Sequence, residues 1–134
     1  HLINYRCGTG HSVSFVGNVH EGPHALNGRN TTLMRPGMIV TDEPGVYETD
    51  LVGIRIENEL VCVHKADNQY GTFLGFEPIM FVPIATSPIV PGVLTKDELD
   101  WLNNYHRQVF EKLAPRLNDE EREWLAKKCA AIGC

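Results

Sequence analysis

Short β-rich runs, separated by glycine and proline, fill the chain up to about residue 93. The run at residues 54–63 alternates between two faces, as a strand does. The run at residues 38–41 is stopped by Glu43-Pro44-Gly45, a turn signal. The runs that predict strands are 12–19, which is weakened by Gly17, 38–41, 54–63 and 73–82.

Beyond residue 94 the hydrophobic pattern becomes helical. Thr95-Lys96-Asp97-Glu98 is a capping box, in which Thr95 caps the first turn and Glu98 reaches back. Apolar residues recur at helical spacing up to Leu113, and Pro115 stops this helix. They are Leu99, Leu102, Val109 and Leu113.

A second helix is predicted from Asn118 to near Gly133, with three acidic residues favouring its first turn. The whole pattern predicts an α+β protein. Its strand-rich domain is residues 1–93, and its helical C-terminal extension is residues 94–134.

Charge and composition exclude several classes of function. The chain has 134 residues, 43% of them hydrophobic, and a net charge of -5. It has no basic stripe, so nucleic acid is not an expected partner. No apolar run reaches the roughly 20 residues that a membrane span needs. We therefore expect a globular protein with no membrane partner.

The cysteines point to a reducing compartment. The four cysteines include no C-x-x-C pair, which argues against a structural zinc site. We expect free thiols and a cytoplasmic protein.

Acidic residues in the strand-rich region are the first candidates for chemistry. Glu57 and Glu59 share a strand face, and buried carboxylates are costly unless they are paired or bound to metal. Glu43 ends a strand just before a Pro-Gly turn, which would hold its side chain rigidly. The alternatives are a solvated sheet face for Glu57 and a surface turn for Glu43.

Two histidines add nitrogen donors to this set. His11 follows Gly8-Thr9-Gly10, where glycines let the backbone approach other groups closely. The alternative is a histidine hydrogen-bonded in a tight turn. His20 would lie on the opposite face of a regular strand from His11, unless a bulge at Gly17 changes the parity. One histidine and two glutamates suit manganese, cobalt, zinc or iron(II).

Four segments together resemble the motifs of the aminopeptidase P family in order and spacing. They are Cys7-Gly8-Thr9-Gly10-His11, Asn18-Val19-His20-Glu21-Gly22-Pro23, Thr41-Asp42-Glu43-Pro44-Gly45 and Gly53-Ile54-Arg55-Ile56-Glu57-Asn58. Members of this family have a pita-bread catalytic domain and remove an N-terminal residue that precedes proline. The resemblance implies that this chain is the C-terminal half of that domain, an antiparallel sheet, followed by C-terminal helices.

The resemblance also implies a role for each matching residue. His11, Glu43 and Glu57 match ligands of a site with two divalent metal ions, often manganese, and Glu43 also matches the general base. His20 matches a histidine that contacts substrate and helps to move protons. Arg55 and Thr41 match groups that hold the ligands in place.

One position departs from the family pattern. Many members have a substrate-contacting histidine four residues before the ligand that His11 matches, and here that residue is Cys7. A thiol is a weaker hydrogen-bond donor than imidazole, so substrate binding is expected to differ. The two aspartate ligands of the family do not occur in this chain. We therefore expect a fragment that is inactive alone.

The sequence thus predicts a metal-dependent Xaa-Pro aminopeptidase acting on peptides with proline second. We also expect a homodimer. One rival is another pita-bread hydrolase, such as a prolidase or methionine aminopeptidase, and the other is a non-catalytic pita-bread module that binds proteins. The presence of three ligand residues argues against the second rival.

Overall fold

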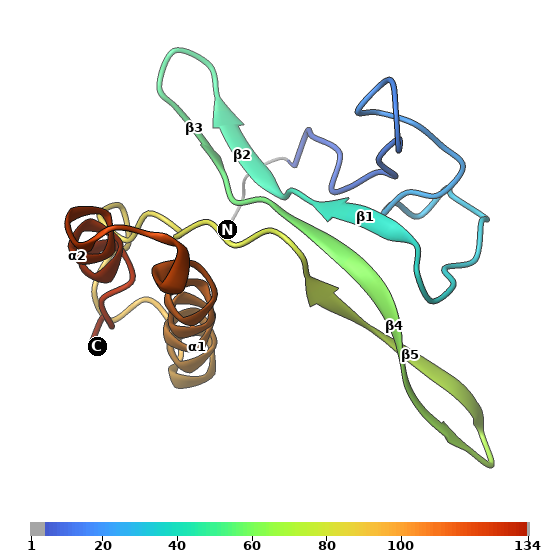
Figure 1. Ribbon diagram of the computed structural model, residues 1–134. Coiled ribbons are helices and arrows are strands. Elements are labelled where there is room, and N and C mark those ends of the chain that lie inside the picture. The colour runs from blue at the N-terminus through green and yellow to red at the C-terminus, as the bar shows by residue number, and fades with distance from the viewer. Residues whose placement is uncertain (1–4, 134) are drawn as a thin grey trace. The chain divides into compact units, whose positions relative to one another are not determined.

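The computed structural model describes residues 5–133, which form two compact units (Figure 1). The first unit extends to Met80 and the second starts at Phe81. The strands are β1 (Ile39–Asp42), β2 (Gly45–Glu48), β3 (Val52–Arg55), β4 (Asn58–Asn68) and β5 (Gly71–Pro78). The helices are α1 (Lys96–Leu113), the 3-10 turn η1 (Ala114–Arg116) and α2 (Asp119–Lys128). Antiparallel strands followed by helices confirm the predicted α+β class.

The strands of the first unit are antiparallel, and the pairing of β1 with β4 is separated from the pairing of β2 with β3 by a short interruption. β1, β4 and β5 form a sheet in the order β1-β4-β5, and β2 and β3 form a hairpin. Asp42 pairs with Asn58 at the end of one ladder, and Gly45 pairs with Arg55 at the start of the next. Both ladders therefore keep a single register. Pro44 lies between them, and proline has no N–H to donate to a ladder.

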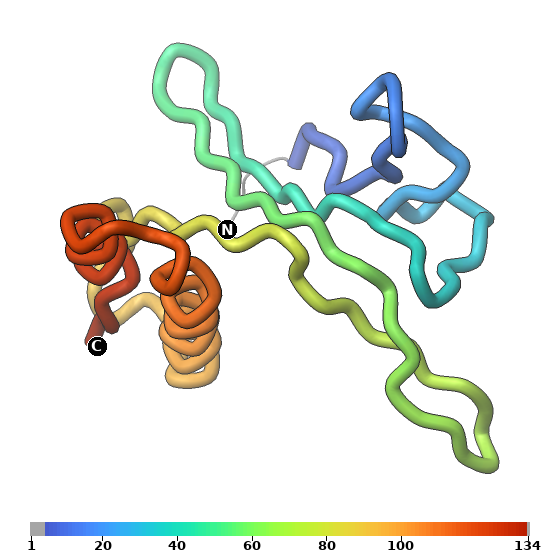
Figure 2. The backbone as a smooth tube through the Cα atoms, in the orientation of Figure 1, coloured from blue at the N-terminus to red at the C-terminus, as the bar shows by residue number. Residues whose placement is uncertain are grey.

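The interruption explains one wrong prediction. The alternating run at residues 54–63 is two strands, because β3 ends at Arg55 and β4 begins at Asn58. β4 then continues to Asn68 and turns into β5, which makes the long two-stranded ribbon of Figure 2. The run predicted at residues 73–82 is present as β5, but it starts earlier and ends at Pro78.

The strand predicted at residues 12–19 was wrong. Only isolated bridges occur there, between His11 and Ala25 and between Ser12 and Val40. The rest of the segment leaves the sheet, and the Phe15 side chain is fully exposed. Its β-branched and aromatic residues therefore lie in a loop.

Both helices begin where the sequence places them. Thr95 and Asn118 accept hydrogen bonds from the third residue of their helices, and Glu98 and Glu121 complete both capping boxes. α2 ends at Lys128, short of the predicted end near Gly133.

Asn103 explains the early end of α2. Its side chain donates to the carbonyl oxygen of Ile132 and accepts from the N–H of Ile132, both at 3.0 Å. The tail is thus bonded to α1 and does not continue the helix.

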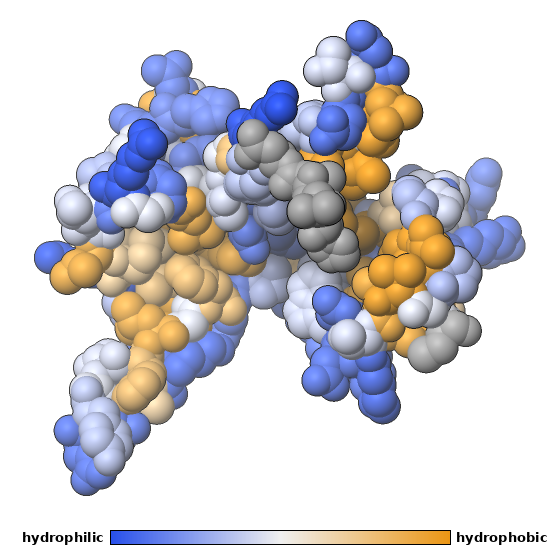
Figure 3. All heavy atoms as spheres, turned by 180° about the vertical axis from the view of Figure 1, so that it is seen from behind, coloured by the Kyte–Doolittle hydropathy of each residue, from blue (hydrophilic) through white to orange (hydrophobic). Residues whose placement is uncertain are grey.

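The hydrophobic core of the second unit lies between its helices. Tyr105, Val109 and Leu125 are buried at its centre, and Phe81 and Ile84 pack against them. In the first unit Val40 and Cys62 are fully buried, while apolar side chains on several strands are exposed, which contributes to the hydrophobic surface in Figure 3. Surfaces of this kind are typical of interfaces.

His106 is a buried hydrogen-bond acceptor in the second unit. Its Nε2 accepts the N–H of Ile84 at 3.0 Å, and its side chain is fully buried. Since Nε2 accepts, Nδ1 carries the proton of the neutral ring, and Nδ1 has no partner among residues 5–133. Burial lowers the pKa of His106 below its usual value.

We predict that the second unit becomes less stable in mild acid. The unfolded chain takes up the His106 proton near pH 6.5, before the folded chain does, so the free energy of unfolding should fall as pH drops below about 6.5. It should keep falling until the lower folded-state pKa is passed. Urea unfolding followed by tryptophan fluorescence from pH 8 to pH 5 measures this.

The matched variant is His106→Gln, whose side chain does not titrate. It should lose this part of the pH dependence. An unchanged slope in the variant would assign the acid sensitivity to other groups.

Candidate metal centre

The segment from Thr9 to Ser12 lies against β1 and brings the candidate residues together. The N–H of Glu43 donates to the carbonyl oxygen of Thr9 at 2.6 Å. The N–H of Thr41 donates to the carbonyl oxygen of His11 at 2.9 Å. These bonds place the motif of His11 beside the motif of Glu43, although they are far apart in sequence.

Gly10 makes this approach possible. The segment is enclosed on its other edge as well, where the N–H of Leu26 donates to the carbonyl oxygen of Gly10 at 2.9 Å. A Cβ at position 10 would lie 1.9 Å from the carbonyl oxygen of Thr41 and 3.1 Å from a methyl carbon of Leu26. Only glycine fits there without displacing backbone.

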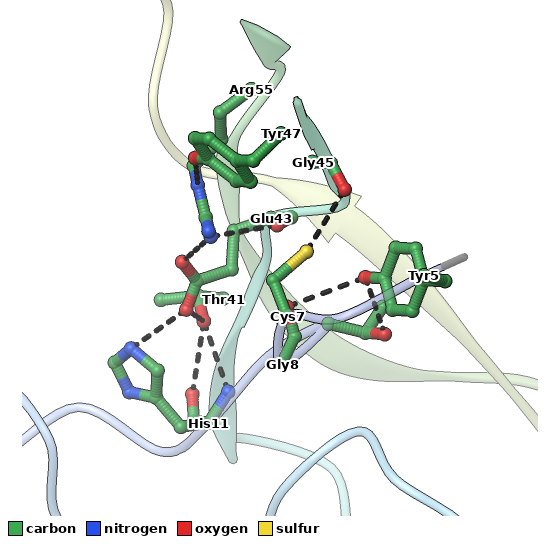
Figure 4. Close-up of polar contacts among 10 residues, drawn as sticks. Tyr5, Cys7, Gly8, His11, Thr41, Glu43, Gly45, Tyr47 and Arg55 are labelled. Carbon is green, nitrogen blue, oxygen red and sulfur yellow. Dashed lines mark hydrogen bonds and ion pairs between the residues drawn. The ribbon is translucent and has the colours of Figure 1, made fainter. Parts of the chain in front are cut away.

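Three potential metal ligands converge at this point. His11 Nε2 lies 3.0 Å from Glu43 Oε1 (Figure 4). The His11 and His20 rings are 4.2 Å apart between centroids. One ligand atom from each of these three residues lies within 4.8 Å of the others. His11 and Glu43 are half-buried and His20 is exposed.

The facing atoms of His11 and Glu43 need a proton or a metal ion between them. His11 Nδ1 is 2.9 Å from the carbonyl oxygen of Ser12, which can only accept, so Nδ1 donates. In the neutral ring Nε2 then presents a lone pair to a carboxylate oxygen, and only a proton or a metal ion makes that contact favourable. Two ligands about 2.1 Å from one ion and at right angles lie about 3.0 Å apart. The donor set and its spacing therefore fit a divalent metal.

Two neighbours fix the carboxylate of Glu43. The Thr41 hydroxyl donates to Oε1 at 3.2 Å and accepts the N–H of His11 at 3.0 Å, and its side chain is buried. Arg55 Nη1 donates to Oε2 and also to the Glu43 carbonyl oxygen, the latter at 2.8 Å (Figure 4). Such partners orient a ligand and fix the direction of its lone pairs.

Tyr47 is a site neighbour that the sequence reasoning missed. Its hydroxyl accepts from Arg55 Nε at 2.8 Å, and the guanidinium carbon lies 5.5 Å from its ring centroid. The hydrogen bond to Tyr47 raises the pKa of Arg55. The missed signal is the pair Gly45 and Gly53, since a Cβ at either position would lie within 3 Å of the Tyr47 ring.

Glu57 lies in the connection between β3 and β4, outside the group of three. Continuing the register of either ladder places Glu57 opposite Glu43. Paired residues in an antiparallel ladder share a face, so both side chains belong to the face of the candidate site. Glu57 is exposed.

Cys7 lies at the β2 end of the site. Its thiol donates to the carbonyl oxygen of Gly45 at 2.9 Å, and the residue is half-buried (Figure 4). Cys7, Cys62 and Cys129 are free thiols, while Cys134 lies outside the described residues.

Comparison with known proteins assigns the chain. Residues 2–64 match the model of metallopeptidase family M24, and residues 72–132 match the C-terminal region of peptidase M24. It belongs to family M24. None of the helices in residues 5–133 has the length and hydropathy that a membrane span requires.

Curated relatives within family M24 share much of this sequence. The chain is 46% identical to aminopeptidase P2 of Arabidopsis thaliana over 130 residues, covering 92% of this chain and 18% of the relative. It is 41% identical to a probable Xaa-Pro aminopeptidase P of Coprinopsis cinerea over 138 residues, covering 97% of this chain and 22% of the relative. The chain thus spans about a fifth of the length of these relatives.

A solved structure supports the same assignment and the pita-bread fold. An X-prolyl aminopeptidase from Caenorhabditis elegans, described as a cytosolic enzyme with a di-nuclear active site, is 39% identical to this chain. It superposes with a TM-score of 0.80 over 93% of this chain and 21% of its own. The fold is therefore that of part of the M24 pita-bread domain.

We predict that Gly10→Ala disrupts the site. The added methyl group collides with the Thr41 backbone, so the change should cost more than the roughly 1–3 kcal/mol typical of overpacking. Urea unfolding measures this cost, and Gly8→Ala is the matched control, because a Cβ at Gly8 meets nothing within 4 Å. Equal stabilities of the two variants would show that the segment does not pack against β1 as described.

Proposed function

We propose that the full-length protein is a metal-dependent Xaa-Pro aminopeptidase, which releases the N-terminal residue from peptides with proline second. The observation that supports this most directly is the contact between His11 Nε2 and Glu43 Oε1, whose donor types and spacing fit a divalent metal, in a chain of family M24. The names of the relatives supply the substrate class.

The cofactor would be two divalent ions. We propose manganese, with zinc, cobalt and iron as alternatives, because the donors are carboxylate and imidazole. His11, Glu43 and Glu57 would be this chain's ligands, since Glu57 lies opposite Glu43 in the shared register. When bound, such ions polarise a carbonyl group and make water more acidic.

Glu43 is suited to act as general base as well as ligand. Oε1 faces His11 and accepts from Thr41, while Oε2 accepts from Arg55. The carboxylate is thus held with a fixed orientation, and it would take a proton from the attacking water and pass it to the leaving proline nitrogen. Arg55 and Thr41 together fix the rotation of this carboxylate.

His20 would contact the substrate and help to move protons. It is exposed, and its ring lies 4.2 Å from the ring of His11. An exposed imidazole beside His11 would be accessible to a bound peptide.

Cys7 would line the substrate site at the position where the family often has histidine. Its thiol already donates to the carbonyl oxygen of Gly45, the first residue of β2. A weak donor there would contribute less to substrate binding than an imidazole would.

We further propose a cytoplasmic homodimer. The solved relative is described as cytosolic, and the three described cysteines are free thiols. Exposed apolar side chains on the strands of the first unit supply surface for an interface.

We predict that the manganese-loaded full-length protein cleaves a tripeptide with proline second, while a dipeptide ending in proline is a poor substrate. Release of the first residue, measured by chromatography, checks this. A preference for the dipeptide would indicate a prolidase, and no turnover with metal bound would favour a protein-binding module.

Glu43→Gln extends the same assay. An amide cannot accept the proton, so kcat should fall by about 10²–10⁴ or more with the fold retained. Glu48→Gln is the matched control, since Glu48 is exposed at the far end of β2. Near-normal kcat in Glu43→Gln would exclude the proposed role.

We predict that Cys7→His changes kinetics by a measurable factor. The imidazole adds a stronger donor on the substrate side, so KM for Xaa-Pro peptides should fall severalfold, with a smaller effect on kcat. Steady-state kinetics on several peptides measure this. Unchanged constants throughout would place Cys7 outside the substrate site.

A further inference from the structure

His24 is a buried histidine to which no role has been given so far. Its side chain is 8% exposed, and its Nε2 lies 2.7 Å from the carbonyl oxygen of Ile39 in β1. A carbonyl oxygen can only accept, so Nε2 donates and Nδ1 has no proton in the neutral ring. Nδ1 has no hydrogen-bond partner within the part of the chain that the structure describes.

The bond from His24 spans three chain segments. Residues 21–26 are the outer segment, residues 9–12 the middle one, and β1 the inner one. Ser12 in the middle segment donates its N–H to the carbonyl oxygen of His24 at 3.0 Å and bridges Val40 in β1 on its other side. The His24 imidazole therefore reaches across the middle segment, and its hydrogen bond to Ile39 links the outer segment directly to β1.

His24 lies on the face away from the candidate metal centre. Residues opposite one another in antiparallel segments share a face, and neighbours along a segment alternate. Ser12 and Val40 are buried, as His24 is, whereas His11 and Thr41 face Glu43. His24 therefore does not reach the reacting groups and can act only by holding others in place.

The group that depends on this tie is His20. It directly precedes the outer segment, whose first backbone bond runs from the Glu21 N–H to the carbonyl oxygen of Ser12 at 3.2 Å. His20 is exposed, and its ring takes part in none of the hydrogen bonds described above for the metal centre. The Glu21 bond to Ser12 anchors the backbone next to His20, so a shift of the outer segment would change the distance of His20 from His11 and Glu43.

We propose that His24 is a positioning residue that holds His20 beside His11 and Glu43. The proposal rests on the proposed function, because its consequence is a productive placement of His20 in the Xaa-Pro site. The outer segment is joined to the middle one by backbone pairing and by the bond from the Ser12 hydroxyl to the Gly22 carbonyl oxygen at 3.3 Å, and the middle segment is paired with β1. The His24 bond adds a direct connection between the outer segment and β1, which would limit movement of one relative to the other.

The test uses the full-length protein loaded with Mn²⁺ and a tripeptide with proline second. His24→Leu removes the donor while keeping the site apolar and filled, and kcat/KM should fall about tenfold. His24→Gln, whose amide N–H can reach Ile39, should recover activity to within about threefold of the unchanged protein. His64→Leu is the matched control, because His64 is an exposed histidine on β4, and it should change nothing.

A double variant separates positioning from general stability. In a His20→Ala background, His24→Leu should have no further effect, because residues that act through one another are non-additive. Equal losses in both backgrounds, or a Gln variant as poor as Leu, would overturn the proposal. If His24→Leu does not fold, His24→Asn is used, since its amide is too short for the bond.

Hydrogen exchange on the metal-free protein tests the tie without any activity. In His24→Leu, the amides of Glu21 and Leu26 should exchange several times faster than in the unchanged protein. In His24→Gln they should exchange at the unchanged rate. The amides of β4 should exchange at the same rate in all three proteins. Unchanged exchange in His24→Leu would overturn the proposal. Absence of Xaa-Pro turnover in the unchanged protein would instead overturn the proposed function, and the exchange result would still decide the role of His24.

Discussion

The site depends on the backbone pairing of Thr9–Ser12 with β1. The two bonds of this pairing, from Glu43 to Thr9 and from Thr41 to His11, bring together motifs that are far apart in sequence. The pairing is possible because Gly10 has no Cβ, and it sets the separation of His11 and Glu43 before any side chain contributes. Main-chain geometry is stiff, so ligands attached to it need little reorganisation when a metal binds.

The electrostatics of the site build on this frame. Glu43 is placed between the cation Arg55, which contacts Oε2, and His11, whose Nε2 faces Oε1. Tyr47 holds Arg55 from the opposite side. The arrangement therefore holds Oε1 of Glu43 and Nε2 of His11 facing each other, where a metal ion would bind.

Features encoded over a few residues were predictable, and features set by distant pairing were not. The capping boxes at Thr95 and Asn118 depend on residues three apart, and both helices start there. The hairpin of β2 and β3 was missed because Pro44-Gly45 resembles the end of a strand, and only the opposite strand shows that pairing resumes. The resemblance identified His11, Glu43 and His20, which the structure brings together, but Tyr47 becomes visible only through the glycines beneath its ring.

The single register through both ladders has a consequence for how the family can vary in length. Continuing the register places Glu43 opposite Glu57, because the chain leaves along β2 and returns along β3 by equal steps. Insertions of matched pairs of residues at the hairpin tip, around Asp50, would lengthen both strands equally and leave the two carboxylates opposite. An insertion between Asp42 and Gly45 would break that opposition. We therefore expect differences in loop length at the tip of the hairpin and not at the interruption between the two ladders.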